Sequence, residues 1–237
     1  MRPSGDLRLR ATATLDANSC VVVIEDDQEF RESLGRLLRS VGLDPRLFAS
    51  IPDFVGSDPP DSPTCLVLDV RLPGRSGLDF QRDLAAAGVT VPIVFITGFG
   101  DIPMTVQAMK AGAVEFLTKP FREQDFLDAV NVGLGRDRVR RENEKALSAL
   151  RARFEELSPR ERAILIRVVE GRLNKQIAFE MGITESTVKV HRSNIMRKVD
   201  AASVPELCRM VDKLKLLPGN PDLSLVPGST RRPPLER

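Results

Sequence analysis

The stretch TCLVLDVRLPGRSG, residues 64–77, places a carboxylate directly after a run of apolar residues. The run over 65–68 contains no polar residue, which is typical of a strand that is buried on both faces of a sheet. Asp69 ends this run. The stretch therefore predicts a buried strand that presents one acidic side chain at its carboxyl end.

Similar apolar runs occur on both sides of this stretch and alternate with amphipathic segments. We predict strands at 20–25, 45–48, 65–69, 92–97 and 114–117, helices at 29–40, 77–87, 103–111 and 122–134, and a loop from 49 to 63. Continuous apolar strands that alternate with amphipathic helices indicate a parallel sheet with helices on both faces. The expected fold class is α/β, a doubly wound five-stranded parallel sheet, followed by a small all-α domain.

Other chemically active side chains stand where the predicted strands end. They are the acidic pair Asp26-Asp27, Thr97 and Lys119. Ligands of doubly wound sheets bind outside the carboxyl ends of the strands, so we expect these side chains to meet Asp69 at one edge. Three carboxylates at one edge repel one another unless a cation lies between them, and oxygen ligands suit Mg²⁺. Asp69 is then an ionised nucleophile for a phosphoryl group, whose oxygens Lys119 and Thr97 can bind.

Each of these features has a simpler explanation when it is taken alone. Asp26 and Asp27 can cap a helix, and Lys119 can be a surface charge. The coincidence of such features at four successive strand ends favours the phosphoryl site.

Charge is divided unevenly along the chain. Residues 20–130 carry 17 acidic and 10 basic side chains, whereas residues 131–217 carry 12 acidic and 19 basic ones. This asymmetry predicts an acidic domain followed by a basic one that suits a polyanion, although two solvated surfaces of opposite charge would give the same counts.

Cysteine and histidine usage argues against disulfides and zinc. Cys20, Cys65 and Cys208 are odd in number and far apart, with no metal-ligand spacing. Two of them stand in apolar strand patterns, which indicates buried thiols in a reducing cytosol. His191 is the only histidine, so a Cys/His zinc site is disfavoured. No apolar run approaches the ~18 residues of a membrane span, and residues 1–19 lack the apolar core of a secretory signal. We therefore expect a cytoplasmic protein with no membrane partner, and disorder in residues 1–19 and 218–237.

The basic half contains a helix-turn-helix pattern over 174–198. Ser158 and Glu161 form a capping box at the start of the preceding helix. Gly182 then separates two helices, and Thr184 caps the second of them. The second helix has an exposed basic face that fits the major groove of DNA, although a helical hairpin within a bundle has the same spacing.

The segment over 136–156 connects the two halves and is rich in Arg and Glu. Leu147, Leu150 and Phe154 follow one another at heptad-like spacing. Two interpretations stay open: a solvated connecting helix, or a short coil that helps to pair two subunits.

Residues 20–135 resemble the receiver domain of a two-component response regulator, which has a flavodoxin-like fold. The matching motifs are IEDD at 24–27, LDVRLPGRSG at 68–77, ITG at 96–98 and EFLTKP at 115–120. The resemblance implies that a sensor histidine kinase phosphorylates Asp69. It also implies that Asp26 and Asp27, with Asp69 and the backbone carbonyl of Arg71, hold Mg²⁺.

The same resemblance implies a switch. The Thr97 hydroxyl moves toward the phosphoryl group, and the ring of Phe116 turns inward. Lys119 precedes Pro120, and this family usually makes that bond cis, which aims the ammonium inward. Arg71 and Phe99 occupy positions that flank the route of the hydrolytic water.

Residues 157–217 resemble the LuxR-type, GerE-like helix-turn-helix domain, so the chain as a whole resembles response regulators of the FixJ/NarL type. The resemblance implies that the bases of DNA face Lys189, Val190 and Ser193, and that its phosphates face Thr187, Arg192 and Lys198. A final helix over about 204–216 supplies a dimer contact in this family.

The combined prediction is a transcription regulator that phosphorylation switches. It comprises a receiver domain at 20–135, a helical linker at 136–156 and a DNA-binding domain at 157–217. We expect no catalytic residues and no enzymatic activity, apart from self-phosphotransfer and slow autodephosphorylation. Phosphorylation would make the surface over 103–111, 114–117 and 122–134 competent to form a homodimer, which presents two recognition helices to promoter DNA. RNA polymerase is a further candidate partner.

Two alternatives remain beside this prediction. Haloacid-dehalogenase-type phosphatases also use an Asp nucleophile, a Thr and a Lys around Mg²⁺. They carry a second Asp two positions after the nucleophile, where this chain has Arg71. The other alternative is a regulator that binds DNA independently of phosphate, which the complete set of site residues disfavours.

Overall fold

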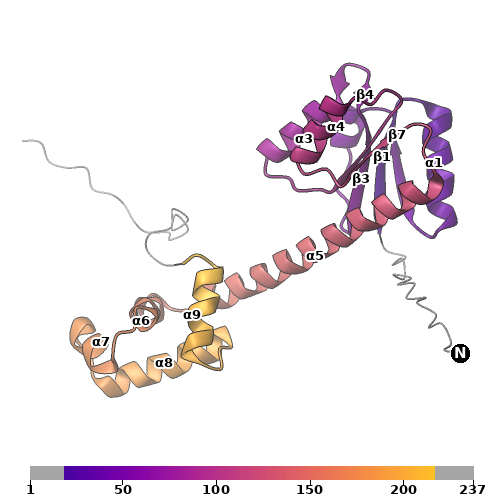
Figure 1. Cartoon of the computed structure of the whole chain (residues 1–237). Helices are drawn as coiled ribbons and strands as arrows, with labels where there is room; N and C mark the ends of the chain where they lie inside the picture. Colours follow the sequence, from indigo (N-terminus) through magenta and orange to yellow (C-terminus); the bar gives the residue numbers. More distant parts are fainter. Residues whose placement is uncertain (1–18, 217–237) are drawn as a thin grey trace, which may run out of the picture. The chain divides into compact units, whose positions relative to one another are not determined.

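The structure is a computed structural model that describes residues 19–216. Disorder was predicted for residues 1–19 and 218–237; all of these lie outside the described residues except Ser19, which is buried. The chain divides after Arg141 into two compact units, which we describe separately (Figure 1).

The first unit is built on a five-stranded parallel sheet in the order β2-β1-β3-β6-β7. Its strands are β1 (Cys20–Ile24), β2 (Asp44–Phe48), β3 (Thr64–Asp69), β6 (Ile93–Thr97) and β7 (Glu115–Thr118). The strand order reverses direction at β1 and β3, which is the arrangement that places a ligand site at their carboxyl ends. This sheet confirms the predicted α/β fold class.

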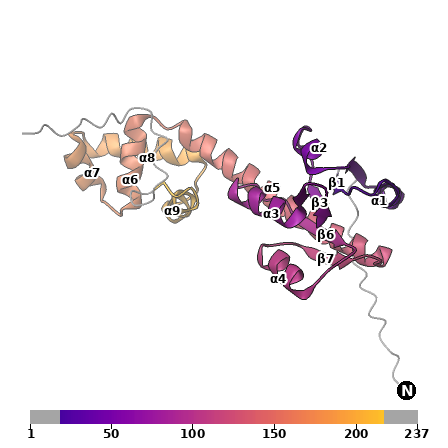
Figure 2. The ribbon, with the colours of Figure 1, turned by 90° about the horizontal axis from the view of Figure 1, so that it is seen from above.

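Helices cover both faces of the sheet, because alternate strand residues point to opposite sides. The helices are α1 (Gln28–Ser40), α2 (Ile51–Val55), α3 (Gly77–Ala86), α4 (Ile102–Lys110) and α5 (Glu123–Glu155). Val21, Val23 and Val67 pack with buried residues of α1 and α5, whereas Val22 and Leu68 pack with those of α2, α3 and α4 (Figure 2). The two apolar cores hold the sheet between two layers of helices.

Three features of the first unit differ from the predicted elements. Residues 49–63 are not entirely loop, because Ser50 caps the short helix α2. A small antiparallel hairpin of β4 (Arg71–Leu72) and β5 (Arg75–Ser76) follows β3. The last helix of the receiver and the linker helix form one continuous helix, α5. Two-residue strands and one-turn helices are too short to show a periodicity in the sequence.

The second unit is helical and contains α6 (Pro159–Val169), α7 (Asn174–Met181), α8 (Glu185–Val199) and α9 (Val204–Lys213). Ile164, Ile177 and Ile195 from three of these helices are at most 1% exposed and form the centre of its core. Gly182 ends α7 with φ 63°, a conformation that glycine adopts without strain, and so permits the tight turn into α8.

Candidate functional site

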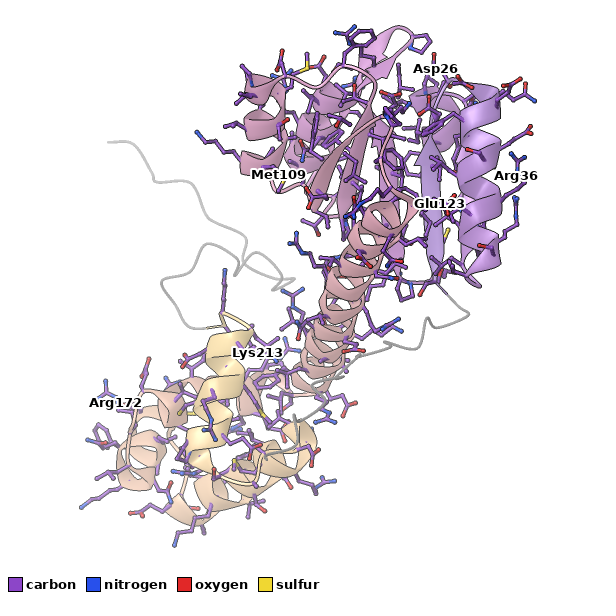
Figure 3. All side chains as sticks on the ribbon, turned by 45° about the vertical axis from the view of Figure 1, so that its right-hand side comes forward. Asp26, Arg36, Met109, Glu123, Arg172 and Lys213 are labelled. Carbon is purple, nitrogen blue, oxygen red and sulfur yellow. The ribbon has the colours of Figure 1, made fainter. Side chains whose placement is uncertain are left out.

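The register of the sheet brings chemically active residues to one edge. Ile24 of β1 lies beside Leu68 of β3, so the residues that follow them, Glu25 and Asp69, are neighbours at the carboxyl end. Thr97 ends β6 at the same edge, because β3 pairs with β6 in parallel. Figure 3 shows Asp26 at this edge of the first unit.

Lys119 joins two buried carboxylates. Its Nζ lies 2.6 Å from Glu25 Oε2 and 2.7 Å from Asp69 Oδ2. The side chains of Glu25 and Asp69 are only 1% and 7% exposed. The pKa of Glu25 is raised to about 7, mainly because the carboxyl is buried; the hydrogen bond with Lys119 opposes this effect, and the nearby charge of Asp69 adds to it. The site therefore holds an excess of negative charge that a single lysine does not fully neutralise.

Carboxylate oxygens of Glu25, Asp26 and Asp69 lie within 4.8 Å of one another. Asp26 is exposed, which leaves the group open to solvent on one side. A set of carboxylate oxygens with solvent access fits Mg²⁺, which keeps part of its water shell. These three residues would hold the ion, and it would supply positive charge for binding phosphoryl oxygens.

The structure does not bring Asp27 into this carboxylate group. Its Oδ1 accepts a hydrogen bond from the backbone N–H of Phe30 at 3.0 Å, so Asp27 is the N-cap of α1. Glu25, which the sequence interpretation passed over, takes the inner position because β1 ends at Ile24 and the next residue continues along the strand direction. The expected role of Asp27 as a metal ligand has no support in this geometry.

The predicted switch residues lie close to the site. Thr97 is fully buried, and its Oγ1 accepts a hydrogen bond of 3.3 Å from the backbone N–H of Phe99. Phe116 is 9% exposed, and its ring centroid lies 6.1 Å from that of Phe95. The bond between Lys119 and Pro120 is cis, as predicted.

Arg71 contributes its backbone and its side chain to different contacts. Its N–H donates to Asp69 Oδ1 at 2.8 Å, which stabilises the ionised carboxylate. Its guanidinium lies over the ring of Phe99, 4.7 Å from the centroid. The position that would carry the general acid of a phosphatase is therefore occupied by a cation stacked on an aromatic ring.

The exposed face of α8 forms the candidate DNA-binding surface. Thr184 caps this helix by accepting a hydrogen bond from the N–H of Thr187. Lys189, Val190 and Ser193 are exposed, and Val190 exposes 59% of its surface. The side chain of Val190 is of the kind that can contact a thymine methyl group in the major groove.

Two of the residues predicted to contact DNA phosphates are engaged within the unit. Arg192 donates to Asn174 Oδ1 at 2.7 Å. The Nζ of Lys198 lies 2.8 Å from Glu161 Oε2 and 3.2 Å from the carbonyl oxygen of Glu156. Lys198 therefore ties α8 to the start of α6, a contact that its sequence position within a basic helix does not reveal.

Glu161 stabilises the second unit in an acid-sensitive way. Its hydrogen bonds with Lys198 and with Ser158 lower its pKa from 4.5 to about 2. A carboxyl whose pKa is lower in the folded state stabilises the fold above pH 4.5 and loses that contribution as the pH falls toward 2. The side chain is 6% exposed. Because water screens these contacts little, the lowered pKa contributes up to about 3 kcal/mol to the free energy of unfolding of the second unit.

Replacing this residue in the full chain by Glu161→Gln is expected to lower the stability of the second unit by about 1–3 kcal/mol at pH 7. The loss relative to the unchanged protein should shrink below pH 4.5, which thermal unfolding at several pH values measures. Glu185→Gln, a change at an exposed residue of α8, is the matched control. Equal stability of Glu161→Gln and the unchanged protein at pH 7 would contradict this account.

The heptad-like residues of the linker belong to the core of the second unit. Phe154 is 6% exposed, and Leu147 and Leu150 pack against the same core. The spacing of these residues is therefore explained by contacts within one chain. Neither interpretation of the linker, as a solvated connecting helix or as a pairing coil, included this packing.

Comparisons with known proteins agree with both units. Residues 21–131 match the family model described as response regulator receiver domain, and residues 155–211 match the model described as bacterial regulatory proteins, luxR family. Nodulation protein W of Bradyrhizobium diazoefficiens is 53% identical over 194 residues, which cover 82% of this chain and 86% of that protein. Transcriptional regulatory protein FixJ of Azorhizobium caulinodans is 44% identical and is covered to 90%.

A solved structure shares this organisation as well. The response regulator StyR matches with a TM-score of 0.74 and 47% identity, over 83% of this chain and 99% of StyR. Within residues 19–216, no helix is long and apolar enough to span a membrane. The matches extend through the receiver and the DNA-binding unit together, which a shared fold of one domain would not produce. The chain therefore belongs to the FixJ/NarL-type response regulators, transcription regulators that join a receiver domain to a LuxR-type DNA-binding domain.

Proposed function

We propose that this protein accepts a phosphoryl group on Asp69 from a sensor histidine kinase and then binds promoter DNA as a dimer. The observation that carries the proposal is the buried pair of Glu25 and Asp69 bridged by Lys119, with Asp26 open to solvent beside them. The proposed site of action is the cytoplasm, where the protein meets both the kinase and DNA.

The residues of the site divide the phosphoryl transfer among them. An oxygen of Asp69 attacks phosphorus, an acyl phosphate forms, and the bond from phosphorus to the histidine nitrogen of the kinase breaks. The ammonium of Lys119, 2.7 Å from Asp69, would bind one phosphoryl oxygen. Thr97 would donate its hydroxyl to another. Mg²⁺, held by Glu25, Asp26 and Asp69 with the carbonyl of Arg71, would neutralise the remaining charge.

Dimerisation is proposed through the surface that includes α4. Ile102, Val106 and Met109 repeat at helical spacing and expose 81%, 44% and 42% of their surfaces. Figure 3 shows Met109 directed away from the first unit. An apolar stripe of this kind is typical of a protein interface. A second copy of the receiver would cover it once phosphorylation favours the paired state.

The direct test is to incubate the protein with Mg²⁺ and acetyl phosphate, with and without a chelator. We expect a mass gain of one phosphoryl group that needs Mg²⁺, formation of dimers, and tighter binding to a DNA site selected from a random library. Dimers and tight DNA binding that do not depend on the phosphodonor would instead indicate the phosphate-independent regulator. Turnover of a phosphate monoester would indicate a phosphatase.

Lys189 provides a test of the DNA-binding face. Lys189→Ala should weaken binding to the selected site about tenfold, because a direct contact with a base or phosphate is lost. Fluorescence anisotropy at fixed salt measures the affinity. Lys145→Ala is the matched control, since Lys145 is an exposed lysine in the part of α5 that belongs to the second unit. Equal losses in both variants would mean that only the overall charge matters.

The stack of Arg71 on Phe99 leads to a prediction about the lifetime of the phosphorylated state. Phe99 is 69% exposed and its ring carries the guanidinium of Arg71, whose backbone N–H binds Asp69; we propose that the stack covers part of the approach to Asp69. Arg71→Ala and Phe99→Ala should each shorten the phosphoryl half-life several-fold, because water reaches the acyl phosphate more easily. Arg75→Ala in the same hairpin is the control. Unchanged half-lives in both site variants would exclude a shielding role.

A further inference from the structure

A further buried carboxylate, on α5, contacts the opposite end of the strand that carries Asp69. Asp137 of α5 is 0% exposed. Its Oδ2 accepts from the backbone N–H of Thr64 at 2.9 Å and from Arg141 Nε at 2.8 Å. Its Oδ1 accepts from Arg140 Nε and Nη2 at 2.9 and 2.7 Å. Charge-assisted hydrogen bonds to a buried carboxylate are among the stronger polar contacts in proteins.

The arginines extend this contact to the loop before β3. Arg141 Nη2 donates to the carbonyl oxygen of Pro60 at 2.9 Å. The side chains of Arg140 and Arg141 are 31% and 27% exposed, so their charges remain partly solvated while the carboxylate is not. We call Asp137, Arg140 and Arg141 the Asp137 clamp. It attaches α5 both to the first residue of β3 and to the chain that leads into it.

Close packing one turn earlier supports the same docking. A Cβ atom on Gly133 would lie 2.5 Å from the Sγ of Cys65, so only glycine permits the approach that the helix makes. Gly133 and Asp137 are four residues apart and therefore share one face of the helix. Two successive turns of α5 thus rest on Thr64 and Cys65.

The clamp joins the start of β3 to the part of α5 that ends the first compact unit. Thr64 begins β3 and Asp69 ends it, and all six residues between and including them are buried. The strand spans about 17 Å from one to the other. Beyond Arg141, where the first compact unit ends, α5 continues to Glu155, and its residue Phe154 belongs to the core of the second unit. The clamp thus lies at the end of the first compact unit, next to the point where α5 passes into the second.

We propose that the Asp137 clamp is a coupling element, which fixes the point where the linker helix leaves the receiver so that phosphorylation at Asp69 changes DNA binding. This inference rests on the proposed function. A continuous helix transmits a change of orientation only while its base is held against the domain that changes. If the clamp is released, the turns around Asp137 separate from β3, and the two units respond independently. Asp137 acts as a positioning residue and does not touch the phosphoryl group.

Asp137→Asn is the main variant, because it keeps the size of the side chain and an acceptor for the Thr64 N–H while it removes the charge. Arg141→Gln is the second variant; it changes a partly exposed side chain, so it tests the clamp even if Asp137→Asn does not fold. Arg136→Gln, at an exposed position on the same helix, is the matched control. Each full-length protein is phosphorylated with acetyl phosphate and Mg²⁺, and the extent of labelling is measured by mass.

The decisive measurement is the ratio of DNA affinities with and without phosphorylation. We expect labelling of both clamp variants within about twofold of the unchanged protein, and a ratio that falls at least about fivefold in Asp137→Asn and less in Arg141→Gln. The ratio in Arg136→Gln should not change. A folded, fully labelled clamp variant that keeps the ratio of the unchanged protein would overturn the inference. If the unchanged protein is labelled but binds DNA equally well with and without phosphorylation, the proposed function fails and the inference fails with it. A clamp variant that keeps the increase in affinity shown by the unchanged protein overturns the inference alone.

Discussion

Asp69→Asn is expected to abolish phosphoryl uptake and the associated increase in DNA affinity, while the protein remains folded. The amide lacks the ionised oxygen that attacks phosphorus. The change also removes one of the two carboxylates around Lys119 and the repulsion that helps to raise the pKa of Glu25. Lys119 keeps its contact of 2.6 Å with Glu25, so the site loses its nucleophile without leaving a buried charge unpaired.

The measurement combines mass analysis with DNA binding, both with acetyl phosphate and Mg²⁺. The unchanged protein should gain affinity by between about five- and 150-fold, and Asp69→Asn should gain none. Asp61→Asn, at an exposed position of the same unit, should behave like the unchanged protein. Labelling of Asp69→Asn at the normal extent would show that another residue is the acceptor.

Lys119→Met is expected to have the largest effect on the stability of the first unit. The change leaves Glu25 and Asp69 buried and without their shared cation. Breaking a buried pair from one side typically costs about 3–5 kcal/mol. The loss here should lie at the lower end of that range, because Glu25, with a pKa already raised to about 7, readily takes up a proton.

Denaturant unfolding in the presence of a chelator and then of Mg²⁺ tests this expectation. Added Mg²⁺ should stabilise Lys119→Met more than the unchanged protein, because the ion supplies the charge that the ammonium supplied. Phosphoryl uptake should remain low even with Mg²⁺, since the lysine also binds a phosphoryl oxygen. Lys110→Met, at an exposed position of α4, is the control. A variant as stable as the unchanged protein in chelator would refute the structural role of Lys119.

Much of the fold followed from the order of apolar runs and amphipathic segments. The parallel sheet and its covering helices were predictable because strands buried on both faces read as continuous apolar sequence. Helix α2 was not, since one helical turn within a segment rich in Pro, Asp and Ser leaves no periodic signal. The single helix α5 was divided in two in the sequence because its apolar face changes partners along its length.

At the end of β1, the predicted ligand pair and the carboxylates that the structure groups differ by one residue. The adjacent aspartates Asp26 and Asp27 suggested a pair of ligands, but the carboxylates that group with Asp69 are those of Glu25 and Asp26. The apolar run ends at Ile24, so Glu25 is the residue beside Asp69, and Asp27 is in the position where a helix needs a cap. A count from the strand end, combined with the N-cap preference of aspartate, contains that information.

Sequence patterns could not predict the hydrogen bonds and ion pairs between residues that are far apart in the chain. Lys198 lies on a basic helix, and nothing near it in the sequence indicates that Glu161 accepts its hydrogen bond. Asp137 and Thr64 are likewise far apart in the chain. Charges that are neutralised across such separations appear as free surface charge in any local pattern, so the sequence predicted a DNA contact for Lys198 and not its contact with Glu161.

The packing of Leu147 and Leu150 in the second core bears on how such regulators can be recombined. A protein fragment that begins at residue 157 would lack part of its own hydrophobic centre, although the helix-turn-helix motif itself would be complete. A fragment that ends before Arg140 would lose the arginines that pair with Asp137. The exchangeable junction is therefore the short exposed stretch 142–146, and chimaeras that join a foreign receiver there would leave both folds intact.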